Sequence, residues 1–294
     1  MPDTEQNILK ATGLLVIEVV NSNPNGDPDK ESDPRIRPDL RGEISPVSFK
    51  RKVRDLIDDK EGPVWKAVSL QFDKQLEADN YVILESRGRV REKIRQEIKD
   101  DLFLKKYWDA RVFGNTFLEE DLSQHLRTGV AQFGLGLSVA PIRVDRLTTT
   151  NKSGVQEGKD RGMAPLGYRI VQHGVYCVPF FVNPSAAQKS GCTRTDIDLL
   201  LKVIPFAYAH TAAYNRAAVE IRHAWYVEHK SPLGSVSDFA VIDALTPKKR
   251  SAPEEPSTTW TDYAVPPGLP KDLEARACSV RDLMAEAYDR AAGA

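Results

Sequence analysis

The sequence has few of the residues that build disulfide or metal frameworks. Among its 294 residues there are three cysteines and five histidines. No two cysteines have the C-x-x-C spacing, and the histidines form no H-E-x-x-H motif. Cysteines as sparse and scattered as these are typical of free thiols in a reducing compartment. We therefore expect no disulfide framework and no metal or other cofactor.

Long hydrophobic runs and an excess of charge of one sign are also absent. No apolar run approaches the roughly 18 residues of a membrane span, and the chain begins with polar residues. We therefore expect neither a membrane span nor a secretory signal, and predict a cytoplasmic protein. Lys and Arg number 41 against 42 Asp and Glu, and this net charge of −1 excludes a uniformly basic coat while permitting a local cationic stripe.

The sequence does contain an alternation of strand and helix patterns. Hydrophobic residues make up 41% of the chain, which suffices for one large globular body with insertions. An order of strand, helix, strands, helix and strand fits an α+β fold of the ferredoxin or RNA-recognition-motif type. The patterns predict strands at residues 13–20, 128–139, 142–149, 168–182 and 220–228, and helices at 46–57, 87–113 and 193–214.

The domain organisation follows from composition. We expect residues 1–246 to form a single body, within which residues 21–44 are a long loop rich in Asn, Asp, Pro and Arg. Residues 247–270 contain six prolines and are expected to form a surface linker. Residues 271–294 are expected to be a helical tail, with an amphipathic helix over about 271–291.

Cations are concentrated in residues 34–54, which lead from the long loop into the helix predicted at 46–57. This stretch has seven cations and two acids, and the helix N-terminus adds partial positive charge and free N–H groups. At about 100° per residue, Phe49, Val53, Leu56 and Ile57 are expected on one face of the helix, with Lys50, Arg51 and Arg54 projecting from another. Such a line suits a phosphate backbone, although a solvated helix face has the same composition. The candidate binding residues here are Arg35, Arg37, Ser45, Ser48, Lys50, Arg51 and Arg54.

Residues 128–139 (TGVAQFGLGLSV) predict a strand with one nearly bare face. Apolar residues alternate with Gln132, Gly134, Gly136 and Ser138, and period two places every apolar side chain on the other face. The glycines would let another backbone approach closely, with Gln132 and Ser138 as hydrogen-bonding groups. That backbone is either a nucleic acid or a helix packed on small residues.

Residues 150–167 (TNKSGVQEGKDRGMAPLG) lack periodicity and lie between two predicted strands, which indicates a protruding arm or long hairpin. An apolar wedge on a cationic arm can displace a base from its stack. A disordered loop is the alternative. The candidate binding residues of the arm are Lys159, Arg161 and Met163, the last at an apolar tip shared with Pro165 and Leu166.

The segment NSNPNGDPD at residues 21–29 matches the first half of an EF-hand calcium loop. Ser32 stands where a bidentate Glu is required, and a strand precedes the loop where a helix is needed, so a calcium site is disfavoured. Asp27, Asp29 and Asp33 could instead hold Mg²⁺ for phosphodiester cleavage. Asx residues beside Pro and Gly also simply make turns.

The chain contains a series of short motifs in a fixed order: NPNGDPD (23–29), K-R-K-x-R (50–54), D-A-R-V-F-G (109–114), G-V-A-Q (129–132), H-G-V-Y (173–176) and H-K with L-G after it (229–234). Taken in this order, the motifs resemble the CRISPR-associated Cas-seven family, the backbone subunit of type I Cascade, and most closely its I-C and I-B branches. The resemblance covers about residues 12–245. The chain departs from the family pattern in two places: Val130 replaces a Pro, and residues 214–218 replace a Ser-Ala-Ala-Arg segment, so Arg216 receives no role.

The resemblance implies a modified RNA-recognition-motif palm with finger insertions and a hairpin thumb. Copies of such a subunit polymerise along CRISPR RNA, which pairs with target DNA in antiviral defence, and other Cascade subunits complete the complex. Ser45, Lys50, Arg51 and Arg54 would bind the RNA backbone, with Gln132 in the same groove. Residues 150–167 would be the thumb, with Met163 as a wedge.

A subunit of this kind is expected to be non-catalytic. Related backbone subunits of type III complexes cut RNA with an acidic residue in the loop after the first strand. A metal-dependent ribonuclease that uses an Asp of the 27–33 loop therefore remains the alternative function.

Overall fold

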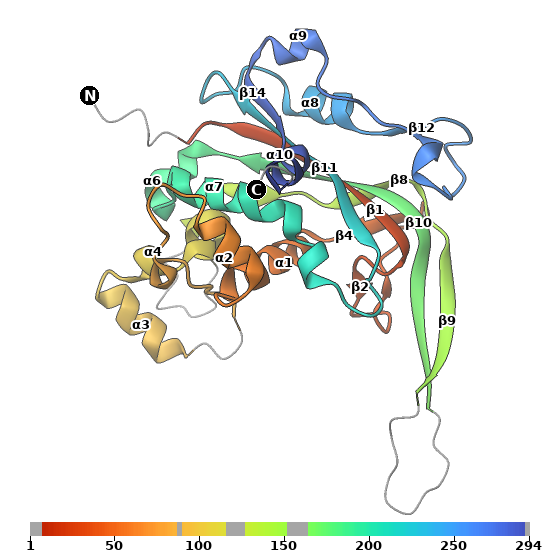
Figure 1. Ribbon diagram of the computed structural model, residues 1–294, viewed down its shortest axis with the longest axis horizontal. Helices are drawn as coiled ribbons and strands as arrows, with labels where there is room; N and C mark the ends of the chain where they lie inside the picture. The colour runs from red at the N-terminus through yellow and green to blue at the C-terminus, as the bar shows by residue number, and fades with distance from the viewer. Residues whose placement is uncertain (1–7, 87–89, 116–126, 152–163, 292–294) are drawn as a thin grey trace, which may run out of the picture.

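A large antiparallel sheet forms the centre of the molecule (Figure 1). The computed structural model describes residues 8–86, 90–115, 127–151 and 164–291. The mixed α and β content agrees with the predicted fold class at this coarse level. The strand order is β14 (Ala277–Asp282), β11 (Val219–His229), β1 (Ala11–Ser22), β10 (Ala164–Val182), β8 (Gly136–Pro141) and β4 (Arg41–Ile44), and both β7 (Ala131–Phe133) and β9 (Val144–Asn151) pair with β10.

Strand β1 lies in the middle of the sheet because it is apolar on both faces. It pairs with β10 from Ala11↔Val182 to Ser22↔Val171, and with β11 on its other edge. Alternate side chains of β1 enter two different cores: Leu15 and Ile17 enter the larger one, and Leu14 and Val16 the smaller. The predictions of a buried strand at 13–20 and of a further strand at 220–228 are confirmed.

Helices cover both faces of the sheet (Figure 1). The larger core lies under α1 (Pro46–Asp58), α2 (Pro63–Ser69), α5 (Trp108–Phe113) and α7 (Arg194–Val203). The smaller core lies under α8 (Asp238–Leu245) and the segment that contains Tyr263 and Leu269. None of the helices in the described ranges is long and apolar enough to cross a bilayer.

Helix α1 forms for the local reasons that the sequence indicates. Ser45 is its N-cap, and the Ser45 hydroxyl accepts a hydrogen bond from the Ser48 N–H (3.2 Å). Pro46 occupies the first turn, where its fixed φ is favourable and its missing N–H costs nothing. Phe49, Val53 and Ile57 are fully buried in the larger core.

Strands β9 and β10 form a long hairpin that extends away from the body (Figure 1). Their pairing runs from Val144↔Val171 to Asn151↔Ala164. The two strands of the predicted hairpin are therefore present and paired with each other. Its connection, with Lys152, Lys159, Arg161 and Met163, lies outside the described residues.

The single strand predicted over residues 128–139 is wrong. The chain forms β6 (Arg127–Thr128), β7 and β8 instead. The register with β10 shifts by one residue between Phe133↔Phe180 and Leu137↔Cys177, and between these pairs the Gly134 N–H donates to the Pro179 carbonyl (2.8 Å). Phe133 is buried, Leu135 is exposed and Gly136 is buried again, so the buried face changes from odd-numbered to even-numbered residues.

The part of the expected bare face at Gly136 and Ser138 is therefore not open to a nucleic acid. Gly136 packs against β4 and β10, because an added Cβ would lie 2.6 Å from Val178 Cγ2 and 3.2 Å from Ile44 Cβ. The Ser138 hydroxyl is buried, accepts a hydrogen bond from the Gly42 N–H (2.9 Å) and donates to the Ala140 carbonyl (2.6 Å). A neighbouring strand takes the place of the nucleic acid or helix that we considered.

The prediction of one continuous helix over residues 87–113 is also wrong. Residues 90–113 form α3 (Arg91–Lys99), α4 (Phe103–Lys106) and α5. Asp101 has φ 56° after α3, and Tyr107 is extended between α4 and α5 because it bridges to Val82. Ile94 and Tyr107 are buried, whereas Val90 and Leu102 are exposed.

The C-terminal third differs from prediction in three places. The helix that begins after Thr193 ends at Val203, and Pro205 lies in the 3₁₀ helix η5 (Ile204–Phe206), which η6 (Ala209–Thr211) follows. The expected surface linker contributes buried Tyr263 and Leu269 to the smaller core. The expected tail helix is divided into α9 (Lys271–Glu274), β14 and α10 (Leu283–Ala291), because β14 pairs with the edge of β11.

The remaining elements are short. The long loop at 21–44 contains the β2–β3 pair and ends in β4, which joins the main sheet. These elements are β2 (Gly26–Asp27), β3 (Asp33–Pro34), β5 (Gly114–Asn115), β12 (Lys248–Lys249), β13 (Tyr263–Ala264) and α6 (Ala187–Ser190), with 3₁₀ helices η2 (Ala78–Asn80), η4 (Pro184–Ala186) and η7 (Trp260–Asp262).

Candidate nucleic-acid interface

A groove of about 200 Å³ lies beside the first turns of α1, where β5, β6 and β7 approach that helix. It contains Lys50, Arg54 and Gln132, three of the candidate residues chosen from sequence. The structure thus brings α1 and Gln132 together, although 78 residues separate Arg54 from Gln132 in sequence. The other lining residues are Val47, Glu85, Phe113, Gly114, Asn115, Thr128 and Gly129.

Lys50 supplies the groove with a partly desolvated positive charge. Its ammonium lies 5.1 Å from the centroid of the Phe113 ring. Burial lowers the pKa of Lys50, and the nearby charge of Arg54 lowers it further, while Glu85 acts in the opposite direction. A charge that has already lost part of its water gains more from an incoming anion than a fully hydrated one does.

Arg54 does not project into solvent as the helical periodicity led us to expect. Its side chain is only 5% exposed, and its Nε donates to Asp109 Oδ2 at 2.8 Å. Its Nη2 lies 3.3 Å from Glu85 Oε2, and its guanidinium lies 5.0 Å from the Phe113 ring centroid. Arg54 therefore joins α1 to α5 and forms a wall of the groove, with its charge already paired.

The D-A-R-V-F-G motif at residues 109–114 builds that wall. Asp109 accepts hydrogen bonds from the Leu84 N–H (2.6 Å) and the Glu85 N–H (3.2 Å), in addition to Arg54. The Phe113 ring stacks edge-on against Phe133 at 6.2 Å. Sequence reasoning used the motif only as a family signature and missed this supporting role.

Arg111 anchors the same motif to α7. Its guanidinium makes two hydrogen bonds to the Asp196 carboxylate, of 3.0 and 2.7 Å. It also donates to the carbonyls of Leu104, Lys105 and Asn80. Because these five bonds use all five N–H donors of the guanidinium, Arg111 positions α5 and has no donor left for a ligand.

Two further cations of the predicted stripe, Arg37 and Arg51, lie on the surface. Arg51 is exposed, forms an ion pair with Asp55 (2.8 Å) and donates to the Glu85 carbonyl (3.1 Å). Arg37 is a loose partner of Asp39 and Glu43, each at 3.9 Å. Exposed pairs of this kind contribute about 0–1 kcal/mol, so a phosphate can replace the carboxylate at little cost.

The loop at residues 21–29 is a scaffold for the start of α1. The Asn25 carbonyl oxygen Oδ1 accepts a hydrogen bond from the Ser45 N–H (2.7 Å), and Asn23 Nδ2 donates to the Ser32 carbonyl (2.8 Å). A strand precedes the loop and a two-residue β-pair occupies it, so the helix–loop–helix frame of a calcium site is not formed. The asparagines turn the chain toward α1, as predicted from their turn chemistry.

Ser45 and Arg35, two of the candidate residues in and beside this loop, already contact other groups of the protein. The Ser45 hydroxyl caps α1, which occupies one of the helix N–H groups we expected to be free. Arg35 Nη2 lies 3.8 Å from Asp27 Oδ1, while Arg35 Nε is buried and has no hydrogen-bond partner among the described residues. Ser48 is half-buried on the exposed side of α1.

The acids of the loop make turns and ion pairs. Asp27 Oδ1 accepts a hydrogen bond from the Asp29 N–H (3.2 Å), and Asp33 forms an ion pair with Arg169 of the long hairpin. Within the ranges that the structure describes, no three His, Cys, Asp or Glu side chains are grouped to hold a metal ion.

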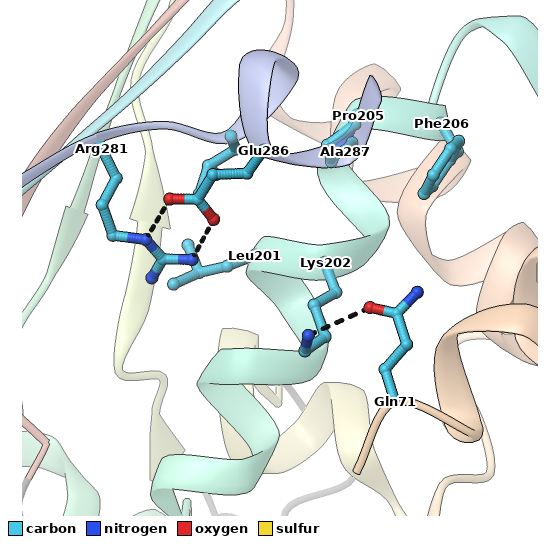
Figure 2. A pocket seen from close by; sticks show the side chains of 9 residues that line it. Gln71, Leu201, Lys202, Pro205, Phe206, Arg281, Glu286 and Ala287 are labelled. Atoms are coloured by element: carbon cyan, nitrogen blue, oxygen red, sulfur yellow. Dashed lines mark hydrogen bonds and ion pairs between the residues drawn. The ribbon is translucent and has the colours of Figure 1, made fainter. Parts of the chain in front are cut away.

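A second hollow, between α7 and α10, is unsuited to a nucleic acid (Figure 2). Its volume is about 50 Å³. Figure 2 shows that its charged groups face protein partners: Arg281 bonds Glu286 at 2.7 and 2.6 Å, and Lys202 donates to Gln71 at 3.1 Å. The groove beside α1 is the better candidate site.

A comparison with protein-family models decides the family of the chain. The model described as CRISPR-associated protein Cas7 matches residues 10–267. The chain belongs to the Cas7 family. The resemblance drawn from short motifs is therefore confirmed, and the match reaches about 20 residues further than those motifs did.

Solved structures similar to this Cas7 chain were also found. Two are chains of a "CRISPR RNA-guided surveillance complex, pre-nicking" and a "CRISPR RNA-guided surveillance complex", at 15% and 16% identity, with TM-scores of 0.48 and 0.47. They cover 76% and 86% of this chain and 77% and 78% of their own. A chain of a Type III-B Cmr-beta complex bound to cognate target RNA is 14% identical over 75% of this chain and 61% of that one, with a TM-score of 0.40. No curated protein matches the sequence.

Proposed function

We propose that this Cas7 protein is the non-catalytic backbone subunit of a type I CRISPR surveillance complex. It binds the phosphate backbone of CRISPR RNA without regard to sequence and polymerises along it. The observation that carries the proposal is the groove beside α1, where Lys50 and Gln132 lie together in a member of the Cas7 family. The proposed partners are CRISPR RNA, further copies of this chain, other Cascade subunits and, through guide pairing, target DNA, in the cytoplasm.

The chemistry of the groove favours backbone contacts over base recognition. Its charged donors are a Lys and an Arg, which contact phosphates, and phosphate contacts fix position without reading sequence. In an RNA-guided complex the base pairs supply specificity, so the protein needs only to hold the strand with its bases displayed. A net charge of −1 agrees with a protein that is cationic only along such a track.

The topology supports the finer proposal of a modified RNA-recognition-motif palm. Strands β11, β1, β10 and β8 are neighbours in that order, α1 lies between β1 and β8 in sequence, and α7 lies between β10 and β11. This is the strand and helix order of the ferredoxin-like motif. The long β9–β10 hairpin is the proposed thumb, and Lys159, Arg161 and the wedge Met163 belong to this proposal.

Removal of Lys50 in the groove and of the neighbouring Arg51 on α1 is expected to weaken RNA binding. For Lys50→Ala/Arg51→Ala we expect a roughly 10- to 100-fold loss of affinity for single-stranded RNA at low salt, because two charge-assisted contacts are lost. The slope of log K against log salt should fall by about 1.4, at about 0.7 for each contact. Filter binding or fluorescence anisotropy across a salt series measures both quantities. Arg54 is left intact, because its substitution would also break the buried pair with Asp109.

The control for this double variant removes two exposed lysines far from the groove lining. Lys66→Ala/Lys99→Ala changes the net charge equally, on α2 and α3, and is expected to leave the affinity within about twofold. Equal losses in the two double variants would mean that only total charge matters. An unchanged affinity and slope for Lys50→Ala/Arg51→Ala would contradict the proposed groove.

The alternative, a metal-dependent ribonuclease, has a direct test. Asp27 and Asp33 are each paired with an arginine, which opposes the binding of a second cation by the same carboxylates. We expect the purified protein–RNA complex to leave labelled target RNA intact in Mg²⁺. Cleavage that disappears in Asp33→Asn, followed on denaturing gels, would overturn the non-catalytic assignment.

A further inference from the structure

The cations of α1 lie on two sides of the helix. Lys52 follows Lys50 by two residues, which at about 100° per residue places it about 160° away around the helix axis. Its side chain is buried, and its ammonium lies 5.1 Å from the centroid of the Tyr208 ring. None of the described residues accepts a hydrogen bond from this ammonium or forms an ion pair with it. Lys52 thus faces away from the groove and has no anionic partner there.

Arg216 lies close enough to Lys52 for its charge to act on the Lys52 ammonium. Arg216 Nε and Tyr208 Oη are both buried, and neither has a hydrogen-bond partner in the described part of the chain. Burial and then the charge of Arg216 lower the pKa of Lys52 to about 8, while Asp55 acts in the opposite direction, and the same Arg216 charge opposes the burial that raises the pKa of Tyr208. Lys52, Tyr208 and Arg216 therefore form one cluster on this side of α1.

The segment that presents Arg216 is held in place. The Arg216 N–H donates to the Ala213 carbonyl (2.8 Å), which closes a turn, and the Asn215 carbonyl accepts a hydrogen bond from the Asn23 N–H (2.7 Å). The Val20 N–H donates to the Ala218 carbonyl (2.9 Å). The same loop that positions Ser45 at the start of α1 thus also positions Arg216.

Ammonium, guanidinium and phenol groups without an acceptor are complementary to an oxyanion. Lys and Arg beside a hydroxyl donor match the several acceptor oxygens of a phosphodiester. A carboxylate of an acidic protein segment has the same charge. An exposed aromatic pair near Arg216 in the chain favours RNA over a carboxylate. Tyr214 is 74% exposed, and the centroid of its ring lies 5.3 Å from that of Tyr168. Aromatic rings beside cations are typical of single-stranded nucleic-acid sites.

We propose that Lys52 and Arg216 form a second phosphate site for the RNA strand that the groove binds, with the Tyr168–Tyr214 pair as a platform for a base. Arg51 and Ser48 lie on the arc of α1 between Lys50 and Lys52, so one strand can cross the helix from one site to the other. The inference rests on the proposed function and extends it, because it assigns a path to the strand beyond the groove.

The test compares two lysines that each lie over an aromatic ring. Lys52→Met is expected to lower the affinity for single-stranded RNA of about 30 nucleotides by about five- to tenfold, and the salt slope by about 0.7. Its melting temperature should not fall, because the ammonium it removes has no hydrogen-bond or ion-pair partner among the described residues. Arg216→Gln should weaken binding by a similar factor.

Lys60 is the matched control. It also lies over a ring, 3.6 Å from the centroid of Trp65, and burial lowers its pKa to about 8. Its ammonium, however, donates to the carbonyls of Ile57 (2.6 Å) and Tyr81 (2.8 Å). Lys60→Met should therefore lower the melting temperature and leave the RNA affinity of the folded protein unchanged.

Each outcome separates this site from the groove. If Lys52→Met and Arg216→Gln bind RNA like the unchanged protein while Lys50→Ala/Arg51→Ala does not, the second site is wrong and the groove stands. If none of the variants loses affinity, the proposed function fails as well. If Lys52→Met loses binding of a poly-glutamate peptide but not of RNA, the cluster of Lys52, Tyr208 and Arg216 binds an acidic protein partner and the inference is overturned. Tyr214→Ala should weaken RNA binding more than Tyr214→Phe, because only Ala removes the ring.

Discussion

Asp109→Ala is expected to lower the free energy of unfolding by about 3–5 kcal/mol. The Asp109 side chain is 1% exposed and forms a buried ion pair with Arg54. Without it the Arg54 charge stays buried with only Glu85, which is half-exposed, as a partner, and the Leu84 and Glu85 N–H groups lose their acceptor. A buried charge and buried donors without partners are among the most costly defects in a protein interior. Urea denaturation of the two proteins measures the difference.

Asp55→Ala is the matched control, because it also removes an Asp carboxylate that is paired with an Arg, but from an exposed pair. Asp55 pairs with Arg51 one turn along α1, and both side chains are about half-exposed. We expect a change of at most about 0.5 kcal/mol. Equal effects of the two substitutions would mean that the Arg54–Asp109 pair does not join α1 to α5. The double variant Arg54→Met/Asp109→Leu should recover part of the loss, since it removes both charges together.

Gly129→Ala is expected to destabilise the protein by about 3 kcal/mol or more. A Cβ at this position would lie 2.0 Å from the carbonyl carbon of Phe113 and 2.3 Å from the Gly114 nitrogen. Both are backbone atoms, so no side-chain rotation relieves the clash, and the β5–β6 pair beside the groove has to separate. Gly114 itself has φ 84°, which further restricts how the chain can yield there.

Gly268→Ala tests whether the effect of Gly129→Ala comes from the clash. No atom lies within 4 Å of a Cβ at Gly268, so we expect a change within about 0.5 kcal/mol. Thermal unfolding compares stability, and RNA binding by the folded fraction reports on the groove. An unchanged melting temperature for Gly129→Ala would contradict the close approach of Gly129 to Phe113.

The sequence located the cations of the groove without placing their partners. Helical periodicity gave the correct buried face of α1, with Phe49, Val53 and Ile57. It also placed Arg54 on an exposed face, because nothing within one turn of Arg54 indicates that Asp109 meets it. Lys52 was counted only as one more cation of a run, although folding directs it away from Lys50 toward Tyr208.

Periodicity failed where the strand register changes. Residues 128–139 alternate without interruption in sequence, yet the pairing with β10 shifts by one residue between Phe133↔Phe180 and Leu137↔Cys177, and the buried face changes. Period two records which residues alternate, but it does not record whether the strand keeps one register with its neighbour. The register of β7 and β8 is fixed by β10 and β4, which come from distant parts of the chain.

The sequence by itself determined β1, α1 with its Ser45 cap, the β9–β10 hairpin and the concentration of cations before and within α1. Apolar runs, caps and charge counts act over a few residues, so they can be read locally. The tertiary structure alone decided that Arg54 is neutralised by Asp109, that Gln132 joins Lys50 in a groove, and that the charge of Arg216 lies near Lys52. Those contacts join residues that are 55, 82 and 164 positions apart, and only packing of the helices on the sheet brings them together.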